Sequence, residues 1–186
     1  LSRSTADDPS GIHINKVIYG GTGCPQGSLN ISLSDDGKVL PLVFGNSYSA
    51  SIGPDVDVAQ NRKNCQLNID LQFSAGFQYT VYSADYYGYA NLDSGVTGAI
   101  RAAYYFSGQT AEIIDEADLT GPFTGYYSKH DTEAIATWSP CGSEGLLNVN
   151  SEVALTTSSG AARGLLTTDR VDAKFVHQLY IKWRSC

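Results

Sequence analysis

Hydrophobic and polar residues alternate along much of this 186-residue chain, most clearly in two segments. In residues 65–73 (CQLNIDLQF) the hydrophobic side chains stand at every second position, and residues 171–183 (VDAKFVHQLYIKW) repeat this arrangement with Gln178 and Tyr180 on the polar side. A period of two is typical of a strand with one face in the core and the other in water. Both segments are therefore predicted to be half-buried β-strands.

Weaker alternation marks several other segments, among them 29–33, 40–44, 77–81, 100–106 and 147–155. Turn-forming residues separate them, and no long window sustains a helical pattern. We therefore predict an all-β fold, an antiparallel β-sandwich or jelly roll of about ten strands. The polar opening (residues 1–11) is expected to be a flexible N-terminal arm, followed by a single β-sandwich domain (residues 12–186).

The four cysteines, at positions 24, 65, 141 and 186, form no C-x-x-C pair. Their even number and wide spacing indicate two structural disulfides in an oxidising compartment. Three connectivities are open, and we favour Cys24–Cys65 with Cys141–Cys186 because each bond would staple one half of the chain. The single sequon, at Asn30, is a candidate N-glycosylation site and agrees with secretion.

A net charge of −7 disfavours nucleic acid and anionic membranes as partners, because both reward clusters of Lys and Arg. No apolar run approaches the length needed to span a bilayer. Methionine is absent, even at position 1, so we expect that a secretory leader has been removed. The predicted localisation is secreted and extracellular, in the host apoplast if the source is a plant-associated fungus.

The residues that could carry chemistry do not form a recognisable catalytic or metal motif. Of the three histidines, His177 is expected in the core and His13 on the surface, while His130 stands next to Asp131. There is no G-x-S-x-G elbow, no zinc-type His spacing and no phosphate-binding glycine loop. We predict a non-enzymatic protein with no cofactor and no metal.

Tyrosines are concentrated between residues 82 and 108, where Tyr104 is expected to face the core. A turn is predicted around Tyr86 to Asp93, and large amphipathic side chains on it would suit contact with a partner. The first set of candidate partner-binding residues is Asp85, Tyr86, Tyr87, Tyr89 and Asp93. A second set lies in the acidic, weakly patterned segment 108–122, which is predicted to be a long surface loop: Glu112, Asp115, Glu116 and Asp118.

Several motifs centred on cysteine and glycine are specific enough to indicate a family. They include GTGCPQGS (21–28), NRKNCQLNIDL (61–71), YGYANLDSGVTG (87–98), WSPCG (138–142) and LNVNSEVAL (147–155). From about Gly20 to Cys186 the chain resembles a secreted, mostly fungal family catalogued as domain of unknown function 4360. The resemblance implies a secreted, cysteine-stapled domain, and members occur among candidate effectors of plant-associated fungi. It supplies no catalytic motif.

Three hypotheses of function follow. The first is an effector-like protein that binds and inhibits an extracellular host protein, with a plant papain-like cysteine protease as the specific guess and the two candidate segments entering its cleft. The alternative is a protein that binds cell-wall carbohydrate through exposed aromatic rings. The third is a hydrolase with an unrecognised carboxylate pair, which requires two acids roughly 5 to 9.5 Å apart.

Overall fold

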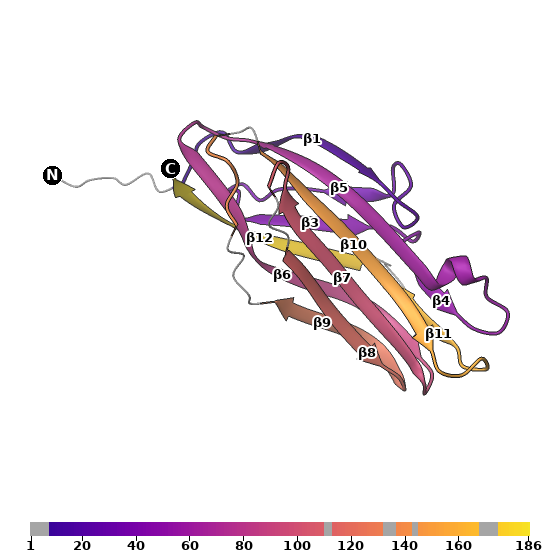
Figure 1. Ribbon diagram of the computed structural model, residues 1–186. Helices are drawn as coiled ribbons and strands as arrows, with labels where there is room; N and C mark the ends of the chain where they lie inside the picture. The colour runs from indigo at the N-terminus through magenta and orange to yellow at the C-terminus, as the bar shows by residue number, and fades with distance from the viewer. Residues whose placement is uncertain (1–7, 110–112, 132–136, 143–144, 168–174) are drawn as a thin grey trace.

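Two antiparallel β-sheets pack face to face in the computed structural model, which describes residues 8–109, 113–131, 137–142, 145–167 and 175–186 (Figure 1). The predicted all-β sandwich is confirmed, with twelve strands in the described residues. Sheet A has the order β1 (His13–Gly20), β5 (Arg62–Gln72), β10 (Leu146–Thr157), β7 (Val96–Phe106), β8 (Ile113–Thr120). Sheet B has the order β2 (Leu29–Ile31), β3 (Val39–Phe44), β12 (Phe175–Ser185), β6 (Phe77–Leu92), β11 (Gly164–Thr167), β4 (Ala50–Ile52), and β9 (Phe123–Asp131) also pairs with β6. The short 3-10 helix η1 (Val58–Asn61) precedes β5.

The alternation seen in the sequence matches the burial of the strands. In β5, Cys65, Leu67, Ile69 and Leu71 are fully buried, and the residues between them are at least partly exposed. Trp183 and His177 on β12 also face the core, as expected for His177. Apolar burial of this kind supplies the main favourable free energy of folding.

Both predicted disulfides are confirmed. Cys24–Cys65 and Cys141–Cys186 join Cα atoms 5.5 and 6.1 Å apart. The first bond lies in the core, where both cysteines are fully buried, whereas Cys141 and Cys186 are exposed. The sequon residue Asn30 is exposed on β2, so the site is accessible, and its glycosylation stays a prediction.

Strand β6 is the centre of sheet B. Along its length it pairs with β12 and then β11 on one side, and from Ala84 to Leu92 it pairs with β9 on the other. The β6–β12 register shifts at one point: Tyr180 lies opposite Ser83, but Ile181 lies opposite Val81, so Tyr82 is an extra residue. Such a bulge resets which side chains face outward.

Two segments predicted to be turn or loop are strands. Residues 86–92 continue β6, and the turn comes later, at Asp93 to Gly95, where the Val96 amide donates to the Asp93 carbonyl. Tyrosine occupies both faces of β6 here, so the sequence shows no alternation. Most of the acidic segment 108–122 is β8, an edge strand that pairs only with β7 among the described residues. Charged side chains are common on edge strands because they prevent edge-to-edge association.

The predicted arm is partly bound to the sandwich. Residues 1–7 lie outside the described residues, but Asp8 forms an ion pair with Lys38 at 2.9 Å. The Ser10 amide donates to Ser74 Oγ at 3.0 Å. The bound part of the chain therefore begins before residue 12.

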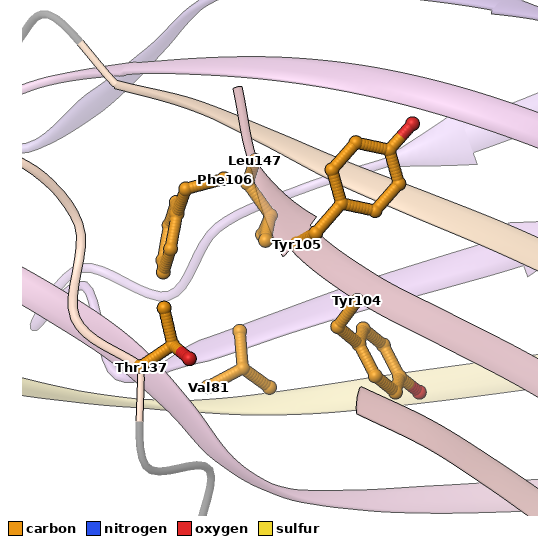
Figure 2. A pocket seen from close by; sticks show the side chains of 6 residues that line it. All are labelled: Val81, Tyr104, Tyr105, Phe106, Thr137 and Leu147. Atoms are coloured by element: carbon orange, nitrogen blue, oxygen red, sulfur yellow. The ribbon is translucent and has the colours of Figure 1, made fainter. Parts of the chain in front are cut away.

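A small cavity lies in the core (Figure 2). Its volume is about 10 Å³, close to that of a single water probe. Figure 2 shows Tyr104 and Tyr105 pointing to opposite sides of β7, so only Tyr104 enters the core, as predicted. The cavity is lined by Val81, Tyr104, Tyr105, Phe106, Thr137 and Leu147.

Candidate functional site

Five tyrosines lie on the outer face of sheet B, contributed by three adjacent strands. Because the bulge at Tyr82 resets the alternation, Tyr82, Asp85, Tyr87 and Tyr89 of β6 all face outward. Tyr82 and Tyr87 are each 42% exposed, and Tyr126 is 64% exposed. We call this surface the tyrosine face; its tyrosines are Tyr82, Tyr87 and Tyr89 of β6, Tyr126 of β9 and Tyr180 of β12.

The rings of the tyrosine face are paired across strands. Tyr89 lies opposite Tyr126 in the β6–β9 register, and their ring centroids are 5.3 Å apart in an edge-to-face arrangement. Tyr82 and Tyr180 are 6.4 Å apart. Cross-strand aromatic pairs stabilise a sheet and hold each ring in place. Tyr82 and Asn91, the outward residues that bound this stretch of β6, are roughly 25 to 30 Å apart along the strand.

Asp85 connects these rings through hydrogen bonds. Its carboxylate accepts from the hydroxyl of Tyr180 at 2.6 Å and from that of Tyr87 at 3.1 Å. It also contacts Nδ1 of His130, whose ring is 56% exposed although the Asp85 side chain is only 12% exposed. Gln178 donates to the Tyr180 hydroxyl at 3.1 Å. The charged acceptor thus fixes two phenols and one imidazole on the same face.

These hydrogen bonds shift the pKa values of both Asp85 and Tyr180. Burial raises the pKa of Asp85, but the hydrogen bonds from Tyr180, His130 and Tyr87 outweigh it and hold the pKa below its usual value. The hydrogen bond to Asp85 is the main cause that raises the pKa of Tyr180 to about 12. At neutral pH Asp85 is therefore ionised, and the Tyr180 hydroxyl that donates to it is neutral.

Two depressions lie near the two ends of this face. One, with a volume of about 560 Å³, is lined by residues in or next to the β6–β7, β8–β9 and β10–β11 turns, including Asn91, Asp93 and Thr124. The other, of about 470 Å³, is lined by Tyr82, Lys38, Lys182, Asp8, Ile181 and Trp183. The rings and depressions together form an extended surface, not a deep pocket.

Most residues of the first predicted set lie on the tyrosine face or at its end. Asp85, Tyr87 and Tyr89 belong to the tyrosine face, and Asp93 lines the depression at its end, where it accepts from the Arg163 amide at 2.8 Å. The prediction for Tyr86 is wrong, because its side chain is 1% exposed and points into the core instead of toward a partner. It faces inward because its outward neighbours Asp85 and Tyr87 fix the alternation of the strand.

The second set lies elsewhere. Glu116 and Asp118 are exposed on β8, opposite Arg101 and Ala99 on the outer face of sheet A. The backbone of Asp115 belongs to the same strand, and Glu112 lies outside the described residues. The two predicted sets therefore do not form one site.

Several residues of the tyrosine face were not singled out from the sequence, namely Tyr82, Tyr126, His130, Gln178 and Tyr180. A signal existed for Gln178 and Tyr180, because the alternation in residues 171–183 places both on the polar side. No local pattern marks Tyr126 or His130, since β9 reaches the face only by pairing with β6.

Tyr86 instead joins a polar cluster inside the sandwich. Its hydroxyl lies 2.9 Å from that of Tyr104, which in turn contacts Nε2 of His177. Tyr86 also stacks on the His177 ring with centroids 4.3 Å apart. Burial lowers the pKa of His177 to about 3, so this imidazole is neutral at physiological pH. The cluster is closed to solvent and is a part of the core.

Within the described residues, no group of three or more His, Cys, Asp or Glu side chains is placed to hold a metal ion. The same part of the chain has no helix of the length and hydrophobicity that a membrane span requires.

Comparisons with known proteins identify relatives of the whole domain. A model of the family described as "Domain of unknown function (DUF4360)" matches residues 10–186. An uncharacterized secreted protein of Arthroderma benhamiae is 48% identical over 183 residues, which is 97% of this chain and 74% of that protein. The predicted family and the predicted secretion are both confirmed.

Three solved structures of carbohydrate-binding modules are weakly similar to this chain. A family 61 module in complex with β-1,4-galactotriose has a TM-score of 0.31 and 10% identity, covering 93% of this chain and 91% of its own. A family 4 module has a TM-score of 0.33 and 14% identity, covering 89% and 94%. A family 28 module specific for non-crystalline cellulose has a TM-score of 0.34 and 11% identity, covering 91% and 88%. Likenesses this weak do not identify a function.

Proposed function

The chain belongs to the DUF4360 family, and we propose that this secreted member is a non-catalytic protein that binds a cell-wall polysaccharide through the tyrosine face. The observation that carries the proposal is the arrangement of five tyrosines on one sheet face around a single ionised carboxylate. It rests on side chains of this chain and on no relative's activity.

The chemistry of the face suits a sugar polymer. A pyranose ring presents C–H groups that pack on the flat side of a phenol, and its hydroxyls need hydrogen-bond partners near that ring. Tyr87 and Tyr180 supply both, because each couples an aromatic ring to a hydroxyl held by Asp85. An extended row of rings on rigid strands can contact several sugar units at a low cost of ordering.

Inhibition of a papain-like protease has less support from the geometry. That hypothesis placed two protruding loops in the protease cleft, and residues 86–92 and 113–120 belong to strands. An exposed tyrosine surface can also bind a protein, so the hypothesis keeps a direct test. Full residual activity of a plant papain-like protease at micromolar concentrations of this protein would remove it.

Hydrolysis by a carboxylate pair is also less well supported. A glycosidase needs a general acid whose pKa is raised so that it holds a proton at working pH. Asp85, the central carboxylate of the tyrosine face, has a lowered pKa. Its three side-chain partners are hydrogen-bond donors, which favour the ionised form and not the acid.

Binding to polysaccharides tests the proposal directly. The protein is incubated with insoluble chitin, cellulose and β-glucan and run by affinity electrophoresis through soluble neutral and acidic polymers. We expect binding to at least one polymer, and a reduction of fivefold or more, about 1 kcal/mol, in Tyr87→Ala and Tyr126→Ala. Tyr105→Ala is the matched control, because Tyr105 faces outward from sheet A. Wild-type protein that binds none of the polymers would overturn the proposal.

A further inference from the structure

The depression beside Tyr82 differs chemically from the one at the other end of the face. It combines an exposed tyrosine ring with two lysines, Lys38 and Lys182, in a volume of about 470 Å³. The depression beside Asn91 is lined by neutral residues and one acid, Asp93, with no Lys or Arg. The tyrosine face therefore has one end with ammonium groups and one end without.

Lys182 is the cation available to a ligand there. It is exposed on the outer face of β12, and it forms no ion pair within the described part of the chain. Its outward neighbour on the same strand, Arg184, lies 3.9 Å over the ring of Trp138. The carboxylates near this end, Asp8 and Asp36, both act on Lys38. Of the two lysines that line this depression, only Lys38 forms an ion pair among the described residues.

The ion pair of Lys38 shows how an ammonium group in this depression binds a carboxylate. Its ammonium group contacts the Asp8 carboxylate at 2.9 Å, and both side chains are about half exposed. The hydrogen bond that Lys38 donates to Asp8 is the main cause of the raised pKa of Lys38, so this lysine stays charged. One ammonium group in the depression thus already binds a carboxylate, and the second is not occupied by a side chain of the described residues.

We infer that the depression lined by Tyr82, Lys38 and Lys182 binds a uronic-acid unit, so that the polysaccharide bound by the protein is acidic. This inference rests on the proposed function and names the ligand class for the same face. The Tyr82 ring packs against the sugar ring, and the ammonium group of Lys182 pairs with the sugar carboxylate. Neutral sugar units of the same polysaccharide lie along Tyr87, Tyr89 and Tyr126.

Local charge decides how strongly the depression attracts a carboxylate, because screening is strong. At physiological ionic strength, exposed charges interact over roughly 8 Å, so distant acids of the protein do not cancel Lys182. A single exposed ammonium–carboxylate pair contributes modestly, which corresponds to a change in affinity of about two- to fivefold. The effect must therefore be measured against a ligand that differs only in its charge.

Polygalacturonate and its methyl ester provide that comparison, since esterification removes the negative charge and keeps the backbone of the polymer. We expect the wild-type protein to bind polygalacturonate more tightly, and to lose this preference as salt rises. Lys182→Gln should bind polygalacturonate about two- to fivefold more weakly and the methyl ester unchanged. Lys16→Gln is the matched control, because Lys16 is an exposed lysine on β1 of sheet A and should leave both affinities unchanged.

The outcomes separate this inference from the proposed function. Equal binding of the free acid and the ester, or equal effects of Lys182→Gln and Lys16→Gln, overturns the uronic-acid site and leaves neutral polysaccharide binding in place. Absence of binding to every polymer, neutral or acidic, overturns both. Thermal melting of the two lysine variants checks that they are folded, and neither side chain is buried.

Discussion

The hydroxyl of Tyr180 donates a 2.6 Å hydrogen bond to the carboxylate of Asp85, although the two residues are 95 positions apart in the chain. The bond is diagonal, because the register places Gln178, not Tyr180, directly opposite Asp85. It couples the orientation of a ring on β12 to a charge on β6. The orientation of Tyr180 and Tyr87 therefore depends on one side chain.

Replacing Asp85 by Asn should release this coupling. The pKa of Tyr180, raised to about 12 chiefly by its hydrogen bond to Asp85, should fall toward the ordinary value of about 10. NMR titration of tyrosine ring carbons between neutral and alkaline pH measures the shift. Asp118→Asn, at an exposed position of β8, is the control and should leave Tyr180 unchanged. A Tyr180 pKa that stays near 12 in Asp85→Asn would contradict the assignment.

His177 makes folding sensitive to acid. Its pKa is lowered to about 3 in the folded protein and is about 6.5 when unfolded, so between these values only the unfolded state binds the proton. The contribution of neutral His177 to the free energy of unfolding is therefore fully present above pH 6.5. It falls by about 1.4 kcal/mol per pH unit as the pH drops toward 3. Urea unfolding at several pH values should show a smaller slope for His177→Phe. His13→Phe, at an exposed position, should keep the wild-type slope.

Gly88 creates the space in which Tyr127 is buried. A Cβ atom at position 88 would lie 2.4 Å from the Tyr127 hydroxyl oxygen, so Gly88→Ala must displace that ring and the β9 strand that carries it. We expect a loss of about 1 to 3 kcal/mol in the free energy of unfolding. Because Tyr126 and His130 are on the same strand, polysaccharide binding should weaken too. Gly160→Ala meets no atom within 4 Å and should match the wild type in both assays.

The two disulfides should differ in their rate of reduction. Cys24 and Cys65 are fully buried, whereas Cys141 and Cys186 are exposed, and a reductant must reach the sulfur that it attacks. Limited treatment with a thiol, followed by alkylation and mass spectrometry, should label positions 141 and 186 first. The sequence separations of 41 and 45 residues are alike, so removal of either bond should cost a similar amount, about 4 kcal/mol. Earlier labelling of positions 24 and 65 would contradict the burial argument.

The sequence predicts the strands whose two faces differ in chemistry. In β5 the buried Leu67, Ile69 and Leu71 alternate with polar residues, and the period is visible without a structure. In β6 the buried Tyr86 and the exposed Tyr87 are the same residue type, so the period disappears and the strand was predicted as a turn. The alternation of residue types along a strand predicts burial only where the inward and outward side chains differ in chemistry.

Only part of the candidate site could be predicted, because only part of it is visible as a local pattern in the sequence. Asp85, Tyr87 and Tyr89 are neighbours in the sequence, and their clustering could be seen there. The contributions of Tyr180, His130 and Tyr126 depend on which strands flank β6 and in which register. The register in turn depends on the bulge at Tyr82, which no turn residue marks. Pairing between distant segments is set by the packing of the whole sandwich.

The bulge at Tyr82 has a consequence for how the protein would select a polymer. Because Tyr87 and Tyr89 stand two positions apart on one strand, the spacing of their rings is set by the backbone, at roughly 6.5 to 7 Å. The extra residue makes the interval from Tyr82 to Asp85 three positions long, so it differs from the two-position intervals between Asp85, Tyr87 and Tyr89. If the face binds a polysaccharide as proposed, it would favour a polymer whose pitch matches these intervals, and two polysaccharides of identical monomers would be distinguished by their helical repeat.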